Sequence, residues 1–305
     1  MSSILVVGSV ALDSVESPFG KAESILGGSA VYFSVAAGYF VEPRLVAVVG
    51  ADFPEAHVEM LRKHKVDLEG LERSTGKTFR WSGSYGYDLN TAHTLQTDLN
   101  VLADFRPAVP ERYKETEYLF LANIDPELQL DVLRQMNRPK VVACDTMNFW
   151  IESKLAALTE VIASVDIAFM NEAEARQFSG ESNLLKAAKK ILSLGPRFVA
   201  IKQGEYGALL FGAGSVFSAP AFLLEEVFDP TGAGDTFAGG FMGYLAHAGR
   251  FDSASLRKAV AFGSVMASFT VEDFSLRRLE RLTHPEIQDR MQHYKRMIEL
   301  EVSDV

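Results

Sequence analysis

The sequence predicts an α/β protein built on a mostly parallel central sheet. Apolar, β-rich runs alternate with helical stretches through most of the 305 residues, which is typical of βαβ units. The first run, residues 4–8, carries no polar side chain and predicts a strand buried on both faces. Residues 78–99 instead alternate polar and apolar residues, which predicts antiparallel strands. We therefore expect one domain with a small β-rich lid.

The composition points to a small-molecule partner. The chain is 48% hydrophobic, enough for a sizeable core, and its formal charge of −10 argues against binding to nucleic acid or to an acidic membrane. Cys144 is the only cysteine, so no intrachain disulfide is possible and a reducing compartment is expected. No apolar run reaches the ~18 residues of a membrane span, and the first residues lack the basic region of a signal peptide. We expect a cytoplasmic protein.

Two early features follow the first strand. Asp13 lies where loops at the carboxyl ends of parallel strands bind ligands, although an exposed loop carboxylate explains it equally well. Gly27, Gly28 and Ser29 then open a helical stretch over residues 30–40.

The next elements follow in order. We expect a strand at 44–49, a helix at 54–63, a connector at 66–70 and the antiparallel strands of 78–99. A βαβ series follows, with strands at 118–122, 141–145, 167–170, 198–202 and 208–211 and helices at 127–136, 154–165, 259–270 and 284–299.

Four aromatic side chains crowd the predicted lid at odd spacing, so they can share one face of a strand pair. They are Phe79, Trp81, Tyr85 and Tyr87. Clustered aromatics pack against one another or at a dimer contact more often than they bind ligand. We favour packing over substrate stacking.

Polar residues follow several predicted strands, where the carboxyl ends of a parallel sheet bind ligands. They are Asn123, Asp125, Asp145 and Asn148, and each is equally suited to cap a helix. Asn171 and Glu174, three residues apart, share one helical face and can converge on one ligand. A capping box explains that pair as well.

The stretch from Asp229 to Gly240 carries the strongest functional signal. Gly232 and Gly234 allow a tight turn whose N–H groups lie at the positive end of the following helix, where a phosphoryl group is favoured. Asp235 would be repelled by that anion, so its position suggests a general base, although a helix cap is the simpler alternative. A Walker-type loop is absent, and a dinucleotide fingerprint fails at Phe237.

The whole 229–240 string resembles the second signature of the ribokinase-like (phosphofructokinase-B type) family of carbohydrate and nucleoside kinases. The resemblance implies a three-layer α/β/α fold for residues 1–305, with lid strands from about 13–28 and 76–100. It implies Asp235 as the catalytic base and Gly232, Ala233 and Gly234 as the anion hole. It also places Asp229 and Thr231 near a monovalent cation site.

Further matches appear in family order. Substrate contacts are implied for a set near the first strands: Asp13, Gly27, Gly28, Ser29, Tyr32 and Asn123. The Asn171/Glu174 pair resembles the family's Asn-x-x-Glu motif, which organises Mg²⁺ and phosphate, with Glu174 acting through water. Nucleotide contacts are implied for Thr231, for Lys202, Gly204 and Gly207 in a turn, and for Gly263 and Ser264 beside adenine. Lys202 stands where many members have Thr.

The resemblance implies an ATP-dependent kinase that transfers the γ-phosphoryl group to a hydroxyl of a small sugar, nucleoside or cyclic polyol. Mg²⁺ is the expected metal, with K⁺ as a further cation, and a homodimer through the lid is expected. Ala11, Ser29 and Tyr32 replace polar groups that ribokinases use, so a free pentose should bind poorly. The rival from another class is a noncatalytic sugar or nucleoside sensor on the same fold; a dinucleotide-dependent oxidoreductase is disfavoured by the missing fingerprint.

Overall fold

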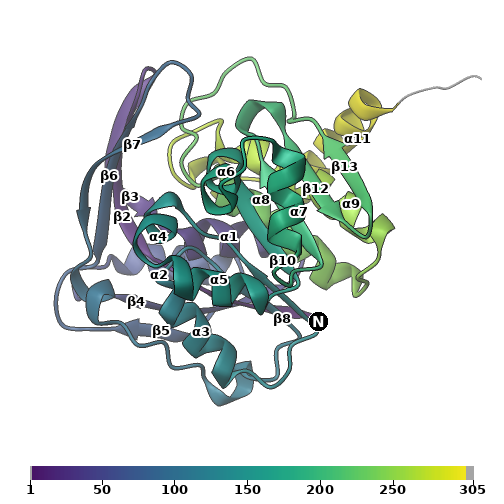
Figure 1. Ribbon diagram of the computed structural model, residues 1–305. Coiled ribbons are helices and arrows are strands. Elements are labelled where there is room, and N and C mark those ends of the chain that lie inside the picture. The colour runs from purple at the N-terminus through teal and green to yellow at the C-terminus, as the bar shows by residue number, and fades with distance from the viewer. Residues whose placement is uncertain (1, 300–305) are drawn as a thin grey trace, which may run out of the picture.

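The central feature is a nine-stranded sheet with helices on both faces (Figure 1). The computed structural model describes residues 2–299. The strand order is β13-β12-β11-β10-β9-β8-β1-β4-β5. Neighbouring strands are parallel from β11 to β5, and β12 and β13 are antiparallel additions at one edge. The predicted α/β fold with a mostly parallel sheet is confirmed.

The strands of this sheet are β1 (Ser3–Val7), β4 (Glu42–Val49), β5 (Asp67–Arg73), β8 (Tyr118–Leu121), β9 (Val141–Cys144), β10 (Ile167–Asn171), β11 (Phe198–Lys202), β12 (Ala208–Gly212) and β13 (Ser215–Ala219).

Alternate side chains of the strands enter two separate cores. In β1, Ile4 and Val6 belong to one core, whereas Leu5 and Val7 belong to the other, as the two-residue period of a strand requires. The first core is covered by α1 (Ser29–Ala37), α2 (Glu55–Lys63), α8 (Ala233–Ala248), α9 (Ser253–Thr270), α10 (Arg277–Glu280) and α11 (His284–Ile298). The second is covered by α3 (Pro126–Gln135), α4 (Asn148–Ser153), α5 (Leu155–Ala163), α6 (Glu172–Ser179) and α7 (Leu184–Leu192). These are the three layers expected.

A second sheet stands apart from the first, at the side of the molecule on the left of Figure 1. Its order is β3-β2-β6-β7, with β2 (Ala11–Ser17), β3 (Gly20–Gly27), β6 (Phe79–Tyr85) and β7 (Ala92–Asp98). The β2–β3 and β6–β7 pairs are antiparallel, whereas β2 and β6 pair in parallel. The strands fall in the two segments predicted for the lid, and a lid motion stays a prediction.

The element boundaries differ from the sequence prediction in a few places. Of residues 66–70, expected as a connector, 67–70 belong to the edge strand β5, whose polar, half-exposed side chains hide the strand pattern. The single helix expected at 154–165 is preceded by a separate short helix, α4. Short 3₁₀ turns cover Asn100–Asp104, Glu111–Tyr113 and Gly204–Tyr206. No helix in the described part of the chain is long and apolar enough to cross a membrane.

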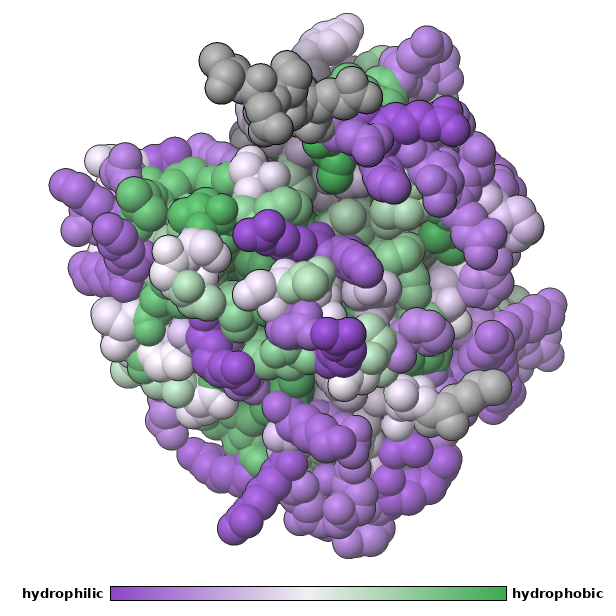
Figure 2. Space-filling model, turned by 90° about the vertical axis from the view of Figure 1, so that its right-hand side faces the viewer, coloured by the Kyte–Doolittle hydropathy of each residue, from purple (hydrophilic) through white to green (hydrophobic). Residues whose placement is uncertain are grey.

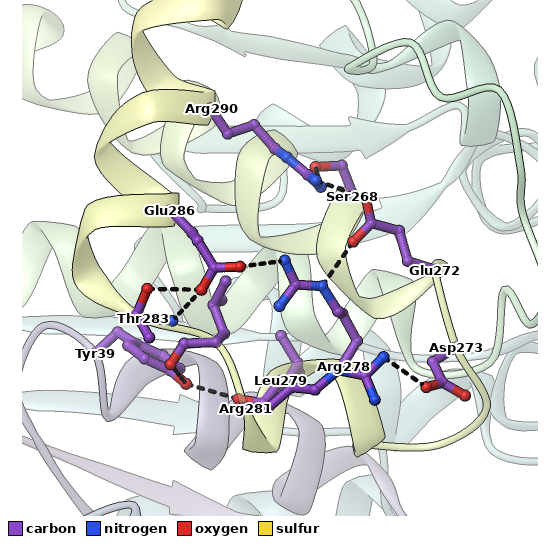
Figure 3. Close-up of polar contacts among 11 residues, drawn as sticks. Tyr39, Ser268, Glu272, Asp273, Arg278, Leu279, Arg281, Thr283, Glu286 and Arg290 are labelled. Atoms are coloured by element: carbon purple, nitrogen blue, oxygen red, sulfur yellow. Dashed lines mark hydrogen bonds and ion pairs between the residues drawn. The ribbon is translucent and has the colours of Figure 1, made fainter.

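The last helix, α11, is attached to α9 and α10 by ion pairs (Figure 3). Arg290 donates to Glu272 at 2.6 Å and to the Ser268 hydroxyl at 3.0 Å. Its guanidinium also lies over the rings of Phe269 and Phe222, 3.5 Å and 5.1 Å from their centroids. The Phe222 contact ties α11 to the loop that leads from β13 towards α8.

That loop has few other anchors. Leu223 is 76% exposed, and Figure 2 shows apolar side chains spread over the face of the molecule where β13 and α11 lie. The hydroxyl of Tyr294, a fully buried residue of α11, donates to the Pro220 carbonyl at 2.7 Å. Arg290 and Tyr294 therefore hold the start of the loop, at Phe222 and Pro220.

We predict that Arg290→Leu lowers the free energy of unfolding by roughly 1–3 kcal/mol, because Glu272 loses one of two partners and two aromatic rings lose a stacked cation. Urea unfolding followed by circular dichroism measures the change. Gln292→Leu, on the exposed side of the same helix, is the control. Equal stability of the two variants would show that the Arg290 contacts do not hold the helix.

Candidate active site

The Asp229–Gly240 stretch forms a tight turn that enters α8. Gly232 is the residue before the helix and has a left-handed backbone, with φ of 76°. A Cβ at this position would lie 2.4 Å from the ring of Tyr32, so both backbone and space require glycine. Ala233 donates to the Pro230 carbonyl at 3.1 Å. Within the described chain, the Gly234 N–H donates to no carbonyl of the turn and remains for a ligand at the positive helix end, whereas the Asp235 N–H contacts its own carboxylate.

Asp229 shapes this turn from inside the protein. Its side chain is fully buried, and its two oxygens accept the N–H groups of Thr231 at 2.9 Å and Ser275 at 3.2 Å. These bonds join the turn to the segment that follows α9. Burial raises the pKa of Asp229, and the two N–H groups together with the Thr231 side chain oppose that effect.

Asp13 lies on β2, beside the Gly27-Gly28 turn. A Cβ on Gly27 would lie 1.9 Å from an Asp13 oxygen, and Gly28 has φ of 97° with its own Cβ position 2.5 Å from the Ser9 carbonyl. Asp13 and the Ser9 backbone therefore lie too close to Gly27 and Gly28 for any side chain at these two positions. Burial raises the pKa of Asp13 to about 7, with the Gly28 N–H lowering it and Asp229 and Asp235 raising it.

Two buried polar atoms near Asp13 lack a hydrogen-bond partner in the described chain: Asp13 Oδ1 and the hydroxyl of Tyr32. Burial raises the pKa of Tyr32 well above its usual value, and the charges of Asp229 and Asp13 add to the effect. Unpaired buried polar groups are costly and rare. A hydroxyl-bearing ligand would give both atoms a partner.

Tyr85, the last residue of β6, brings the second sheet into the site. Its hydroxyl lies 3.2 Å from the Thr231 hydroxyl. Burial raises the pKa of Tyr85 to about 12; Thr231 lowers it, while Asp229, Asp13 and Asp235 raise it. The second sheet therefore contacts the Asp229–Gly240 turn at Thr231.

Lys202, at the end of β11, forms an ion pair with Asp145, which follows β9. Lys202 Nζ is 2.5 Å from Asp145 Oδ2, and the two side chains are 16% and 3% exposed. A Cβ added to Gly234 would lie 3.1 Å from the ammonium. The structure thus places a positive charge beside Gly234.

Asn171 and Glu174 form the reciprocal capping box of α6. The Asn171 side chain accepts the Glu174 N–H at 2.8 Å, and the Glu174 carboxylate accepts the Asn171 N–H and side-chain amide, both at 2.7 Å. The capping explanation left open by the sequence is therefore present. Glu174 also lies near the other charged groups of the site. Burial raises its pKa to about 7, the Lys202 charge lowers this pKa, and the charges of Asp145 and Asp235 raise it.

Asp235, in the first turn of α8, connects the two groups of side chains. Burial raises its pKa to about 7, the nearby Asp145 charge raises it further, and Lys202 lowers it. It also influences the pKa of Asp13 and of Tyr32 on the other side. A carboxyl with a pKa near neutrality can accept a proton efficiently at cellular pH.

The remaining predicted residues lie around this centre. The Ser29 hydroxyl donates to the Asn123 carbonyl at 3.2 Å and lies 3.1 Å from the Ser9 hydroxyl, and Asn123 Oδ1 accepts the Trp150 indole N–H at 2.9 Å. The side chains of Ser29 and Asn123 therefore both hydrogen-bond to neighbouring segments of the protein. Their substrate contacts stay a prediction.

The predicted nucleotide-side glycines differ in setting. Gly204 and Gly207 have φ of 56° and 97°, and a Cβ on Gly204 would lie 2.2 Å from the side chain of Asn90 in the β6–β7 connection. Gly263 packs α9 against α8, since its Cβ would lie 2.8 Å from the Phe237 carbonyl. Ser264 is buried and faces Tyr294 of α11. An adenine contact for Gly263 or Ser264 stays a prediction.

Two participants were not singled out as site residues from the sequence. Tyr85 was expected to pack within the lid, and nothing in its spacing separates it from its aromatic neighbours. Asp145 was one of several polar residues at strand ends, and only the tertiary pairing with Lys202 distinguishes it.

These residues could bind a phosphate group next to the Asp235 carboxyl, and the comparisons with known proteins agree with such a site. The family model described as pfkB family carbohydrate kinase matches residues 1–280. The chain belongs to this family. Cytidine kinase of Thermococcus kodakarensis is 30% identical over 79% of this chain and 88% of its own. Nucleoside kinase of Methanocaldococcus jannaschii is 26% identical over 89% and 91%. This pfkB family kinase is therefore a phosphotransferase that acts on sugars or nucleosides.

Solved structures of other family members share the fold. The M. jannaschii nucleoside kinase structure superposes with a TM-score of 0.77 and 21% identity, covering 96% of this chain and 99% of that one. Burkholderia thailandensis nucleoside kinase in complex with ADP-inosine gives a TM-score of 0.77 at 17% identity, covering 95% of each chain. The ribokinase-like three-layer architecture is confirmed.

The raised pKa of Asp235 predicts a pH-dependent effect of Asp235→Asn on stability. Between its unfolded pKa near 3.8 and its folded pKa of about 7, the parent binds more protons when folded, so its free energy of unfolding falls as pH rises through this window. Asn has no charge to bury. The variant should be more stable than the parent at pH 8, on the order of a few kcal/mol, and the difference should shrink towards pH 4.5.

Urea unfolding of both proteins at several pH values measures this difference, and groups common to both cancel. Asp104→Asn, at an exposed carboxyl, should show no such pH-dependent gain. A constant difference across the range would mean that Asp235 is not held at a raised pKa.

Proposed function

We propose that the protein transfers the γ-phosphoryl group of ATP to a hydroxyl of a nucleoside. The observation that carries the proposal is the position of Asp235 between two groups of side chains. On one side are the unpaired polar atoms of Asp13 and Tyr32, and on the other are the Gly232–Gly234 turn and the Lys202 ammonium. An acceptor hydroxyl and a phosphoryl group can therefore meet at one carboxylate.

The acceptor side supports a ligand with hydroxyl groups and a broad apolar face. Asp13 would accept a hydrogen bond from an acceptor hydroxyl, and the Tyr32 hydroxyl would donate one. The ring of Tyr32 and the lid residue Tyr85 give the pocket aromatic walls, which suit a base more than a bare pentose. The similarity to cytidine and nucleoside kinases favours the same acceptor class.

Asp235 would take the proton of the acceptor hydroxyl as the oxygen attacks phosphorus. The developing negative charge would be stabilised by the Gly234 N–H at the start of α8 and by Lys202. These groups are fixed before the reaction, since α8 is packed along its length against α1 and α9. Little rearrangement is then needed when charge develops.

The residues present fit a nucleotide with its metal. The glycine turn offers the Gly234 N–H and the Lys202 ammonium offers charge, as a triphosphate requires. Mg²⁺, when bound, would neutralise charge on the phosphate oxygens, and it usually retains several waters with few protein ligands. Glu174 would then hold it through water, because both Glu174 oxygens already accept from Asn171. Asp229 and Thr231 would lie by the monovalent cation, K⁺.

ADP release tests the proposal. With Mg-ATP and K⁺, the protein should phosphorylate a nucleoside, and cytidine is the first candidate, with kcat/KM at least tenfold above that for ribose, since a pocket built around more contacts discriminates against smaller ligands. The panel includes fructose, fructose phosphates, myo-inositol and the common nucleosides. Ribose as the best acceptor would contradict the assignment of a nucleoside.

Asp235→Asn is the companion measurement on the same panel. It should lower kcat by on the order of 10²- to 10⁴-fold, the usual contribution of a general base, and leave acceptor binding measured by calorimetry nearly unchanged. Parental turnover in this variant would remove Asp235 from the role of base. Acceptor binding without ADP release from the parent would instead support the noncatalytic sensor.

A homodimer through the lid is a further part of the proposal. The side chains of the edge strand β7 are exposed from Ala92 to Thr97, and an unpaired strand edge commonly pairs with another chain. Analytical ultracentrifugation of the parent and of Leu95→Lys, an exposed apolar position on β7, should give a dimer and a monomer respectively. A parent that stays monomeric at tens of micromolar would contradict this part.

A further inference from the structure

The Lys202–Asp145 ion pair has a geometry that suggests a role for Asp145, to which no function has yet been given. We propose that Asp145 is a positioning residue of phosphoryl transfer: it holds the Lys202 ammonium against the Gly232–Gly234 turn and away from the carboxylate of Asp235. This inference rests on the proposed kinase function. It concerns how the Lys202 ammonium is positioned and not whether phosphate is bound.

The pair spans three neighbouring strands. Lys202 pairs in register with Asn171 of β10, and β10 separates β11 from β9, after which Asp145 follows. The lysine side chain therefore crosses the end of β10 to reach its partner. On the way it passes the turn, since a Cβ on Gly234 would lie only 3.1 Å from Nζ. The anchor thus fixes the ammonium at the place where a phosphoryl group would lie.

The ammonium keeps capacity for a ligand. A lysine ammonium has three donors, and within the described chain Lys202 uses one, to Asp145. The two others are available for phosphoryl oxygens. The side chain retains 16% of its exposed surface, whereas that of Asp145 retains 3%, so the cation and not its anchor is open to the site.

Asp145 is held in place and still has one carboxylate oxygen for the ammonium. Its Oδ1 accepts the Thr146 N–H at 2.9 Å, and its backbone carbonyl accepts the Gln129 side-chain amide at 3.1 Å. Both Glu174 oxygens are occupied by Asn171. The Asp145 carboxylate is therefore held in place with one oxygen directed at Lys202.

Glu174, another carboxyl group near the ammonium, already accepts from Asn171 with both oxygens, so without the Asp145 anchor the ammonium would be drawn to Asp235. An ion pair between them would stabilise the charged form of Asp235 and lower its pKa, which weakens it as a base. It would also draw the ammonium away from the turn. Asp145 prevents both effects with one contact. A buried ion pair is weak support for stability by itself, so a role in the site explains it better.

The test uses three variants of the full protein: Asp145→Asn, Lys202→Met and the double variant. Lys202→Met should lower kcat by on the order of 10²-fold, as does removal of one group that stabilises transition-state charge. Asp145→Asn keeps the ammonium but frees it, and kcat should fall about tenfold or more with a smaller change in KM for ATP, because the interaction acts in the transition state. The double variant should match Lys202→Met, since Asp145 acts only through Lys202.

An exposed ion pair at the opposite edge of the sheet provides the control. Lys140 and Glu117 lie just before β9 and β8, 2.6 Å apart. Glu117→Gln and Lys140→Met should leave kcat unchanged. Circular dichroism and thermal unfolding of every variant exclude misfolding as the cause of lost turnover. If Asp145→Asn alone does not fold, the double variant, which removes both charges together, decides the question.

Parental kcat in Asp145→Asn would overturn the positioning role, as would losses that multiply in the double variant. In either case the kinase itself remains, because the parent still releases ADP. Absence of ADP release from the parent with every acceptor would overturn both this inference and the proposed function.

Discussion

Several carboxyl groups are buried at one edge of the sheet, and in the described part of the chain the Lys202 ammonium lies among them. The surrounding structure has to compensate for these buried charges. Parallel strands all end at the same edge, so polar groups that follow them converge. Asp145 is balanced by Lys202, and Asp229 by two backbone N–H groups. Asp13, Glu174 and Asp235 have pKa values of about 7 because burial disfavours their charge. Two extensive apolar cores, one on each face of the sheet, stabilise a fold that carries this cluster.

The second sheet contacts both ends of the same site. Tyr85 reaches Thr231 of the Asp229–Gly240 turn, and Asn90, in the connection that follows β6, lies against Gly204 and donates to Glu205 at 3.4 Å. One hairpin therefore contacts two turns that precede and follow β12 and β13 in the chain. Under the proposed function, displacement of this hairpin would expose the acceptor side and the nucleotide side together.

The sequence predicted features set by local chemistry and missed those set by distant contacts. The 229–240 string defines its own turn, because Gly232 needs a left-handed backbone, and it was recognised. Asn171 and Glu174 supported two explanations because capping and ligand binding need the same residue types at the same spacing. Strand β5 was missed since an edge strand with half-exposed polar side chains has no clear period. Tyr85 and Asp145 gain their roles from partners 146 and 57 residues away, which no local pattern records.

The terminal helix α11 lies beyond the part of the chain that matches the family, residues 1–280. It nevertheless contributes Tyr294, which is fully buried, and Arg290, which covers Phe269 of α9. A chain cut at residue 280 would expose that ring to water and leave Glu272 without Arg290. In this protein a segment beyond the family match is thus part of the core and supports the loop between β13 and α8.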